Sequence, residues 1–147
     1  ALAAAGYERI ALVGDSAGGG LALALMTATH LRCDPHLTGA VVFSPWTDLA
    51  LTGASLRTRA AVDPLLSREW LDEAAALYPG THYLRESQCA SRDADLTDRP
   101  PVLLHVGDDE VLLDDSTRFA DHVELYLQES LAFMAFTAEP SVPMNAG

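Results

Sequence analysis

The stretch Gly14-Asp15-Ser16-Ala17-Gly18-Gly19 follows directly on the apolar run Ile10-Ala11-Leu12-Val13 and leads into the helix-forming run Leu21-Ala22-Leu23-Ala24-Leu25-Met26. It fits the pattern G-x-S-x-G, in which a serine lies on a sharp turn between a β-strand and an α-helix. A serine at the tip of such a turn leaves little room for side chains two positions away, so Gly14 and Gly18 are expected there. The alternative is a glycine-rich turn whose serine only caps the helix. The apolar run before the turn and the helix former after it favour the first interpretation.

Ser16 is the candidate nucleophile of this turn. The helix that follows points its N-terminal amides at the serine, and the N–H of Ala17 is placed to donate to a developing oxyanion. A serine hydroxyl is a weak nucleophile unless an imidazole takes its proton and a carboxylate orients that imidazole. An acid and then a histidine are therefore expected after Ser16 in chain order.

Two further segments make the chain resemble the hormone-sensitive-lipase-like esterases of the α/β-hydrolase superfamily. In these esterases the turn that carries the serine, called the nucleophile elbow, reads GDSAGG. Ser44-Pro45-Trp46-Thr47-Asp48-Leu49 follows the next apolar run, and the segment from Pro100 to Glu110 resembles the strand and loop that carry the acid. The resemblance covers most of residues 1–125 and corresponds to the C-terminal half of a family member. It implies an α/β chain with a partial α/β-hydrolase fold, a mostly parallel sheet flanked by helices. The implied reaction is the hydrolysis of carboxylic esters, with no cofactor and no metal.

The resemblance also places Asp109, in Gly107-Asp108-Asp109-Glu110, at the position of the family's catalytic aspartate. Asp108 is the alternative. A second explanation for acidic residues in this region is that they stabilise the N-terminus of the next helix, and it fits Asp114 and Asp115 better.

No histidine stands where the resemblance requires the general base. Of the five histidines, only His122 follows Asp109, and it lies about one helix beyond the acid loop. The family's histidine belongs to a run E-x-M-x-H that follows the last strand. The matching run here is Glu129-Ser130-Leu131-Ala132-Phe133, so Phe133 takes the place of the histidine and the base remains unassigned.

The oxyanion hole of the family is completed by an H-G-G-G loop upstream of the elbow. That loop, like the cap that shapes the acyl pocket, would precede Ala1, which leaves the N–H of Ala17 as one donor. Three hypotheses follow. The chain is an ester hydrolase that is incomplete or inactive as given, a catalytically inert remnant, or one part of a split or oligomeric enzyme.

Composition restricts the partners. The 147 residues include 21 acidic side chains against 9 Lys and Arg, a formal net charge of −12, which argues against nucleic acid and anionic membranes. No apolar run approaches the length of a membrane span. Cys33 and Cys89 are isolated, so free thiols in a reducing, cytoplasmic setting are expected rather than a metal site or disulfides. The expected partners are a small-molecule ester and a second copy of the chain, met through an exposed sheet edge.

The order of elements alternates strand and helix, which predicts a mostly parallel sheet. Strands are expected at 9–14, 39–44 and 102–106, with a fourth at 123–127 where polar and apolar residues alternate. Helices are expected at about 17–32, 67–78 and 113–123, the second capped by Ser67. Residues 1–139 are predicted to form the catalytic domain, and residues 140–147 an irregular tail.

Overall fold

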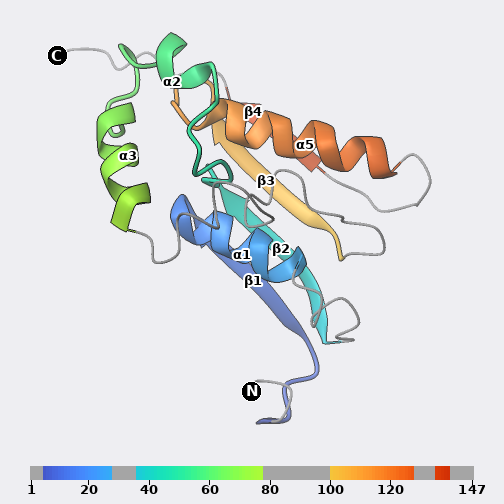
Figure 1. Cartoon of the computed structure of the whole chain (residues 1–147). Coiled ribbons are helices and arrows are strands. Elements are labelled where there is room, and N and C mark those ends of the chain that lie inside the picture. Colours follow the sequence, from blue (N-terminus) through green and yellow to red (C-terminus); the bar gives the residue numbers. More distant parts are fainter. Residues whose placement is uncertain (1–4, 28–35, 78–99, 128–134, 140–147) are drawn as a thin grey trace, which may run out of the picture.

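The computed structural model describes residues 5–27, 36–77, 100–127 and 135–139, and within these a four-stranded parallel sheet with helices (Figure 1). The elements in chain order are β1 (Ile10–Asp15), α1 (Ala17–Thr27), β2 (Leu37–Phe43), α2 (Ser55–Thr58), α3 (Arg68–Leu77), β3 (Val102–Gly107), α5 (Leu113–Leu127) and β4 (Ala135–Glu139). The strands pair in the order β1-β2-β3-β4, each parallel to the next. The predicted α/β class with a parallel sheet is therefore confirmed.

The register of the sheet brings the carboxyl ends of the strands to one edge. Asp15 at the end of β1 is level with Phe43 at the end of β2, and Phe43 is level with His105 near the end of β3. Gly107 at the end of β3 is level with Glu139 at the end of β4. Residues that directly follow β1, β2 and β3 consequently gather at this carboxyl edge, where open α/β sheets form their ligand sites.

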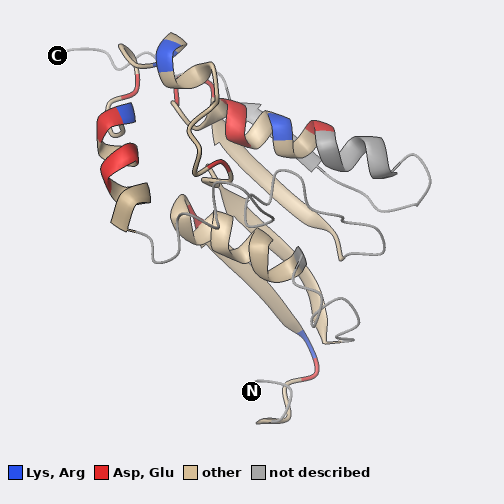
Figure 2. Ribbon diagram, in the orientation of Figure 1, with Lys and Arg blue, Asp and Glu red and all other residues tan. Residues whose placement is uncertain are grey.

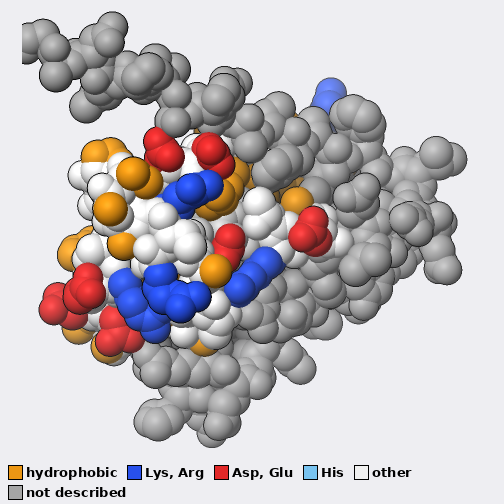
Figure 3. Space-filling model, turned by 90° about the horizontal axis from the view of Figure 1, so that it is seen from above, with side chains coloured by type: hydrophobic (Ala, Val, Ile, Leu, Met, Phe, Trp, Pro, Cys, Tyr) orange, Lys and Arg blue, Asp and Glu red, His pale blue; other side chains and the backbone are white. Residues whose placement is uncertain are grey.

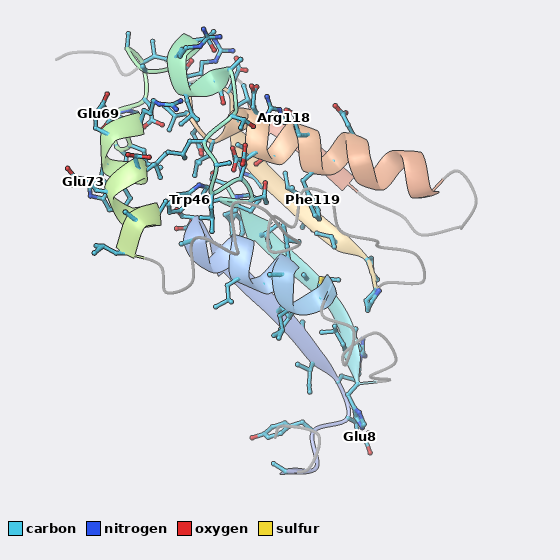
Figure 4. The ribbon with its side chains drawn as sticks, in the orientation of Figure 1. Glu8, Trp46, Glu69, Glu73, Arg118 and Phe119 are labelled. Carbon is cyan, nitrogen blue, oxygen red and sulfur yellow. The ribbon has the colours of Figure 1, made fainter. Side chains whose placement is uncertain are left out.

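Helices α1 and α5 cover the same face of the sheet. The main core contains Leu23 and Met26 from α1, Val42 and Leu104 from β2 and β3, and Phe119 from α5, all with no exposed surface. Figure 4 shows Phe119 on the side of α5 that faces β3. The alternation of the strands sends the intervening side chains to the opposite face.

On that opposite face, large apolar side chains are exposed. Val13 of β1 retains 70% of its surface, and Phe43 of β2 and Leu103 of β3 retain 43% each. Parallel sheets are normally covered on both faces by helices or other segments. Within the part of the chain that the structure describes, one face of the sheet is covered and the other is largely open.

A second apolar cluster lies at the carboxyl edge. It joins the loop after β2 to α2, α3 and the segment that leads into α5, through Trp46, Leu51, Leu56, Leu71, Ala75, Val111 and Leu112. Figure 4 shows Trp46 between α1 and α3, and Figure 2 shows charged residues on α2, α3 and the first turns of α5, with few on the strands. Trp46 is 8% exposed and its indole N–H donates to the carbonyl of Asp48 at 3.2 Å, so it packs as a core residue.

Two local predictions can be compared with the elements. Ser67 caps α3, because its hydroxyl accepts the N–H of Trp70 at 3.2 Å, as predicted. The predicted strand at 123–127 is wrong, because α5 continues to Leu127 and the fourth strand is Ala135–Glu139. Five alternating residues at the end of an amphipathic helix do not distinguish the two periods, and packing of α5 through Phe119 favours the helix. The predicted tail, residues 140–147, lies outside the described residues.

Candidate active site

Ser16 occupies the turn between β1 and α1 with a left-handed backbone, at a φ of 53°. Its N–H donates to the carbonyl of Phe43 at 2.9 Å, which extends the pairing of β1 with β2 by one residue. Its carbonyl accepts the N–H of Gly20 at 3.0 Å and the N–H of Trp46 at 2.9 Å. A non-glycine residue with positive φ persists only where its surroundings fix it, and such residues concentrate at functional sites.

The close approach of α1 to its surroundings explains some glycines of the motif and not others. A Cβ on Gly14 would lie 2.5 Å from the carbonyl carbon of Gly18 and 2.7 Å from the nitrogen of Gly19, which backbone cannot accommodate. A Cβ on Gly18 would meet nothing within 4 Å, so the steric reason expected for this glycine is not found. Gly20, which sequence reasoning missed, is the second position where a side chain is excluded, because its Cβ would run into the carbonyl of Trp46. The run of three glycines was the available signal.

The acid loop follows β3, at the same edge as Ser16. Asp108 is engaged: its Oδ1 pairs with a guanidinium nitrogen of Arg59 at 3.3 Å. Asp109 is half-buried, and among the described residues its carboxylate has no side-chain or backbone partner. Of the two candidates, Asp109 is thus the carboxylate left available to orient an imidazole.

The described histidines do not lie where a base is needed. His36 directly precedes β2, at the amino end of the sheet, where its carbonyl accepts the N–H of Ile10 at 2.7 Å. His105 belongs to β3, and its ring lies 6.2 Å from that of Phe43, on the face opposite α1 and α5. His122 falls within α5, and its side chain lies outside the described residues.

The hypothesis that Phe133 replaces the histidine concerns a residue outside the described part of the chain. β4 begins at Ala135, so Phe133 precedes this strand, whereas the family's histidine is expected after the last strand. Residues 140–147, which come after β4, contain no histidine. The base therefore stays unassigned.

Asp115 connects α5 to the loop that supports the elbow. Its Oδ2 accepts the backbone N–H of Thr47 at 2.9 Å and that of Asp48 at 2.8 Å, and the Thr47 hydroxyl donates to the carbonyl of Asp115 at 3.2 Å. Burial raises the pKa of the Asp115 carboxyl to about 7, against the opposing effect of these N–H groups and of Arg118. Because Trp46 holds the carbonyl of Ser16, this loop fixes the elbow from the side of α5.

Asp114 bonds across the chain in a similar way, in addition to pairing with Arg118 of its own helix at 3.9 Å. Its Oδ2 accepts the N–H groups of Ala54 and Ser55 at the start of α2. The sequence suggested that Asp114 and Asp115 stabilise the N-terminus of their own helix. Both do lie in its first turn, but their carboxylates satisfy orphan N–H groups of other segments.

Asp48 organises the same loop from within. Its carboxylate accepts the N–H of Ala50 at 3.0 Å and that of Thr52 at 2.9 Å, and it also accepts the Thr52 hydroxyl. Arg118 lies 3.8 Å from this carboxylate, and Figure 4 shows it on α5 near the loop. A buried carboxylate is tolerated here because each oxygen has a donor.

A parallel sheet with a strained serine between its first strand and first helix, and an available carboxylate after the third strand, defines an α/β-hydrolase type of domain. The chain belongs to the α/β-hydrolase fold family, whose model matches residues 2–133.

Individual relatives agree with this. The chain is 43% identical over 108 residues to an acetyl-hydrolase of Streptomyces hygroscopicus, covering 74% of this chain and 36% of that protein. It is 40% identical over 124 residues to an esterase of Acinetobacter venetianus, covering 78% and 38% respectively. The crystal structure of an esterase from the bacterial hormone-sensitive lipase family superposes with a TM-score of 0.84 at 35% identity, over 97% of this chain and 47% of that one. The resemblance to hormone-sensitive-lipase-like esterases is thereby confirmed, and the chain spans less than half the length of each of these relatives.

Other kinds of site receive no support from the part of the chain that the structure describes. No group of His, Cys, Asp and Glu there could hold a metal ion. Among the same residues, none of the helices has the length and apolar character needed to cross a membrane. Cys33 and Cys89 lie outside the described residues.

Proposed function

We propose that this chain carries the nucleophile and the acid of a carboxylic-ester hydrolase. Ser16 attacks the ester carbonyl carbon, and the alcohol leaves with the proton that a base has taken from the serine hydroxyl. Water then attacks the acyl-enzyme, releases the carboxylic acid and restores the serine. The N–H of Ala17, the first residue of α1, donates to the oxyanion in both steps.

The observation that carries this proposal is the shared edge. Ser16, held in a left-handed conformation, follows β1, and Asp109, without a partner among the described residues, follows β3. In a serine hydrolase these two residues do not touch, because an imidazole lies between them. The names of the relatives, an acetyl-hydrolase and an esterase, support a small-molecule ester as substrate.

No histidine that the structure describes lies beside Ser16 and Asp109, so an imidazole can be supplied from solution in a direct experiment. The chain is treated with a fluorophosphonate, which modifies activated serines, with and without added imidazole, and the modified residue is identified by mass spectrometry. We expect Ser16 to be modified, and imidazole in solution to accelerate the reaction because it can act as the unassigned base. A chain that is modified no faster when folded than when unfolded in urea, with no response to imidazole, is the inert remnant instead.

Matched variants identify the residues. Ser16→Ala should abolish the modification. Ser44 is the matched control, because it also directly follows a strand and has a positive φ, of 42°. Ser44→Ala should leave the modification intact, because no long helix begins after Ser44 to direct its N–H groups at the serine. Asp109→Asn should reduce the imidazole-dependent rate by at least about tenfold, since loss of the orienting aspartate costs on the order of 10⁴ in an intact triad. Asp108→Asn should reduce it less, and the reverse order would assign the acid to Asp108.

A further inference from the structure

The segment that follows α2 contacts the acid loop on both sides of Asp109. On one side, the Arg59 guanidinium pairs with Asp108 at 3.3 Å. On the other side, Oδ2 of Asp63 accepts the backbone N–H of Val111 at 2.8 Å, across 48 positions of sequence. The two contacts therefore flank Asp109 closely, one residue before it and two residues after it.

Arg59 and Asp63 belong to one hydrogen-bonded turn. The N–H of Asp63 donates to the carbonyl of Arg59 at 2.9 Å, which closes the turn. The other carboxylate oxygen of Asp63, Oδ1, accepts the N–H of Leu65 at 2.8 Å and that of Leu66 at 2.9 Å. Pro64 lies between Asp63 and Leu65, and its ring holds its φ near the value that such a turn requires. Asp63 thus uses one oxygen to hold its own turn and the other to hold the acid loop.

The acid loop has few other restraints near Asp109. Glu110 reaches back, with its Oε1 accepting the N–H of Gly107 at 2.8 Å, and its own N–H has a long bond of 3.4 Å to the carbonyl of Gly107. Val111 is anchored more firmly, because it is fully buried and its carbonyl accepts the Ser55 hydroxyl at 2.6 Å. The backbone that carries Asp109 therefore spans from the end of β3 to an anchored Val111. Figure 3, which looks down on this edge, shows acidic and basic side chains interleaved over it.

We propose that Arg59 and Asp63 are positioning residues for Asp109: they fix the acid loop on either side of it and so set where its carboxylate is presented to an imidazole. A triad acid acts by orienting the imidazole, and displacements of about 1 Å cost large factors in rate. The proposal rests on the proposed role of Asp109 as the acid. It gives the turn at Asp63-Pro64 a role beyond holding its own backbone.

The experiment reads the acid loop directly, by ¹⁵N relaxation and amide hydrogen exchange on the labelled chain. In Asp63→Asn only one acceptor oxygen remains for two sets of N–H donors. We expect the Val111 amide to exchange at least about tenfold faster, and the order parameters of residues 108–111 to fall from about 0.85 towards 0.6. Arg59→Lys, which loses the guanidinium fork but keeps the charge, should lower the order parameters at Asp108 and Asp109. It also provides an independent result if the Asp63 variant does not fold.

The matched control is Ser67→Ala. It removes the cap of α3, close to the same turn, without touching the acid loop, so it should leave residues 108–111 as ordered as before. Unchanged order and exchange at 108–111 in both Arg59→Lys and Asp63→Asn would overturn the proposal, as would an equal loss of protection over the whole sheet. Modification of Ser16 by the fluorophosphonate is measured separately. Its failure would refute the ester hydrolase while leaving the loop measurement interpretable.

Discussion

Replacing Asp115 by asparagine tests how the loop beneath the elbow is held. Asp115 is 3% exposed, and a single oxygen, Oδ2, accepts both N–H groups of the loop after β2. The amide oxygen of asparagine can take the place of this oxygen, so the variant keeps both bonds and loses only the ionisable group.

The sign of the pH dependence follows from the raised pKa. The pKa of Asp115 is about 7 in the folded chain against 3.8 for the unperturbed carboxyl, chiefly because of burial. The folded state therefore binds this proton more tightly than the unfolded state. Its contribution to stability is fully present below about pH 4 and is lost as the pH rises through 7.

The size of the effect is set by the same shift. A change of about three pKa units at about 1.36 kcal/mol per unit corresponds to about 4 kcal/mol between the two ends of this range. Local rearrangement and water penetration reduce such penalties, so we expect a difference of about 2 to 4 kcal/mol. Relative to Asp115→Asn, the unchanged chain should lose this amount of unfolding free energy between pH 4 and pH 8.

The assay is urea unfolding of both chains in dilute solution across this pH range. Subtracting the two curves removes the contribution of every other titrating group that the substitution leaves alone. Asp121→Asn is the matched control, because Asp121 is an exposed aspartate on the same helix and the variant shows what removal of a carboxylate from α5 does by itself. A flat or rising difference for Asp115 would refute the reasoning, since it would mean that the N–H groups of Thr47 and Asp48, with Arg118, keep the carboxylate ionised.

Three shorter predictions concern the elbow, the activity and the sheet. Gly20→Ala should lower the unfolding free energy by about 1 to 3 kcal/mol, because the added Cβ would run into the carbonyl of Trp46. Gly18→Ala should leave the unfolding free energy unchanged or raise it by up to about 1 kcal/mol. Equal effects of the two variants in urea unfolding would contradict the close approach of Gly20 to Trp46. We expect these 147 residues to show negligible turnover of a short-chain nitrophenyl ester, because the base is unassigned and a serine hydrolase without its base is slower by about a million-fold. Robust turnover that is abolished by Ser16→Ala would contradict this. The chain should self-associate, because β1 lies at the edge of the sheet formed by the described strands and leaves Val13 70% exposed. A monodisperse monomer with a sharp melt in light scattering and calorimetry would count against this.

The features that depend on neighbours in sequence were predictable. The strand, turn and helix around Ser16 fall within the 18 residues from Ile10 to Thr27, so apolar periodicity and glycine placement suffice to recognise them. The cap of α3 by Ser67 is likewise a matter of a few residues. Alternation of strands and helices makes the sheet parallel, and parallel strands bring the residues after β1 and β3 to one edge. The shared edge of Ser16 and Asp109 therefore follows from chain order.

The features that depend on contacts between residues far apart in the sequence could not be predicted. The resemblance favours Asp109 over Asp108, but the ion pair that separates the two carboxylates comes from Arg59, 49 positions away from Asp108. Similarly, Asp115 looks like a helix-terminal charge until the N–H groups of Thr47 and Asp48, more than 60 positions away, are found on its carboxylate.

Sequence by itself thus determined the class of the domain, the nucleophile candidate and the sheet edge that Ser16 and Asp109 share, because these rest on local periodicity and on the geometry of parallel strands. Only the tertiary structure decided which carboxylate is available, that Gly20 rather than Gly18 is sterically required, and that residues 123–127 continue a helix. Each of these outcomes depends on a side chain or backbone group brought close by folding. The energy of a buried charge or of a Cβ in contact with a carbonyl is set by those neighbours, and their identity is not encoded near the residue itself.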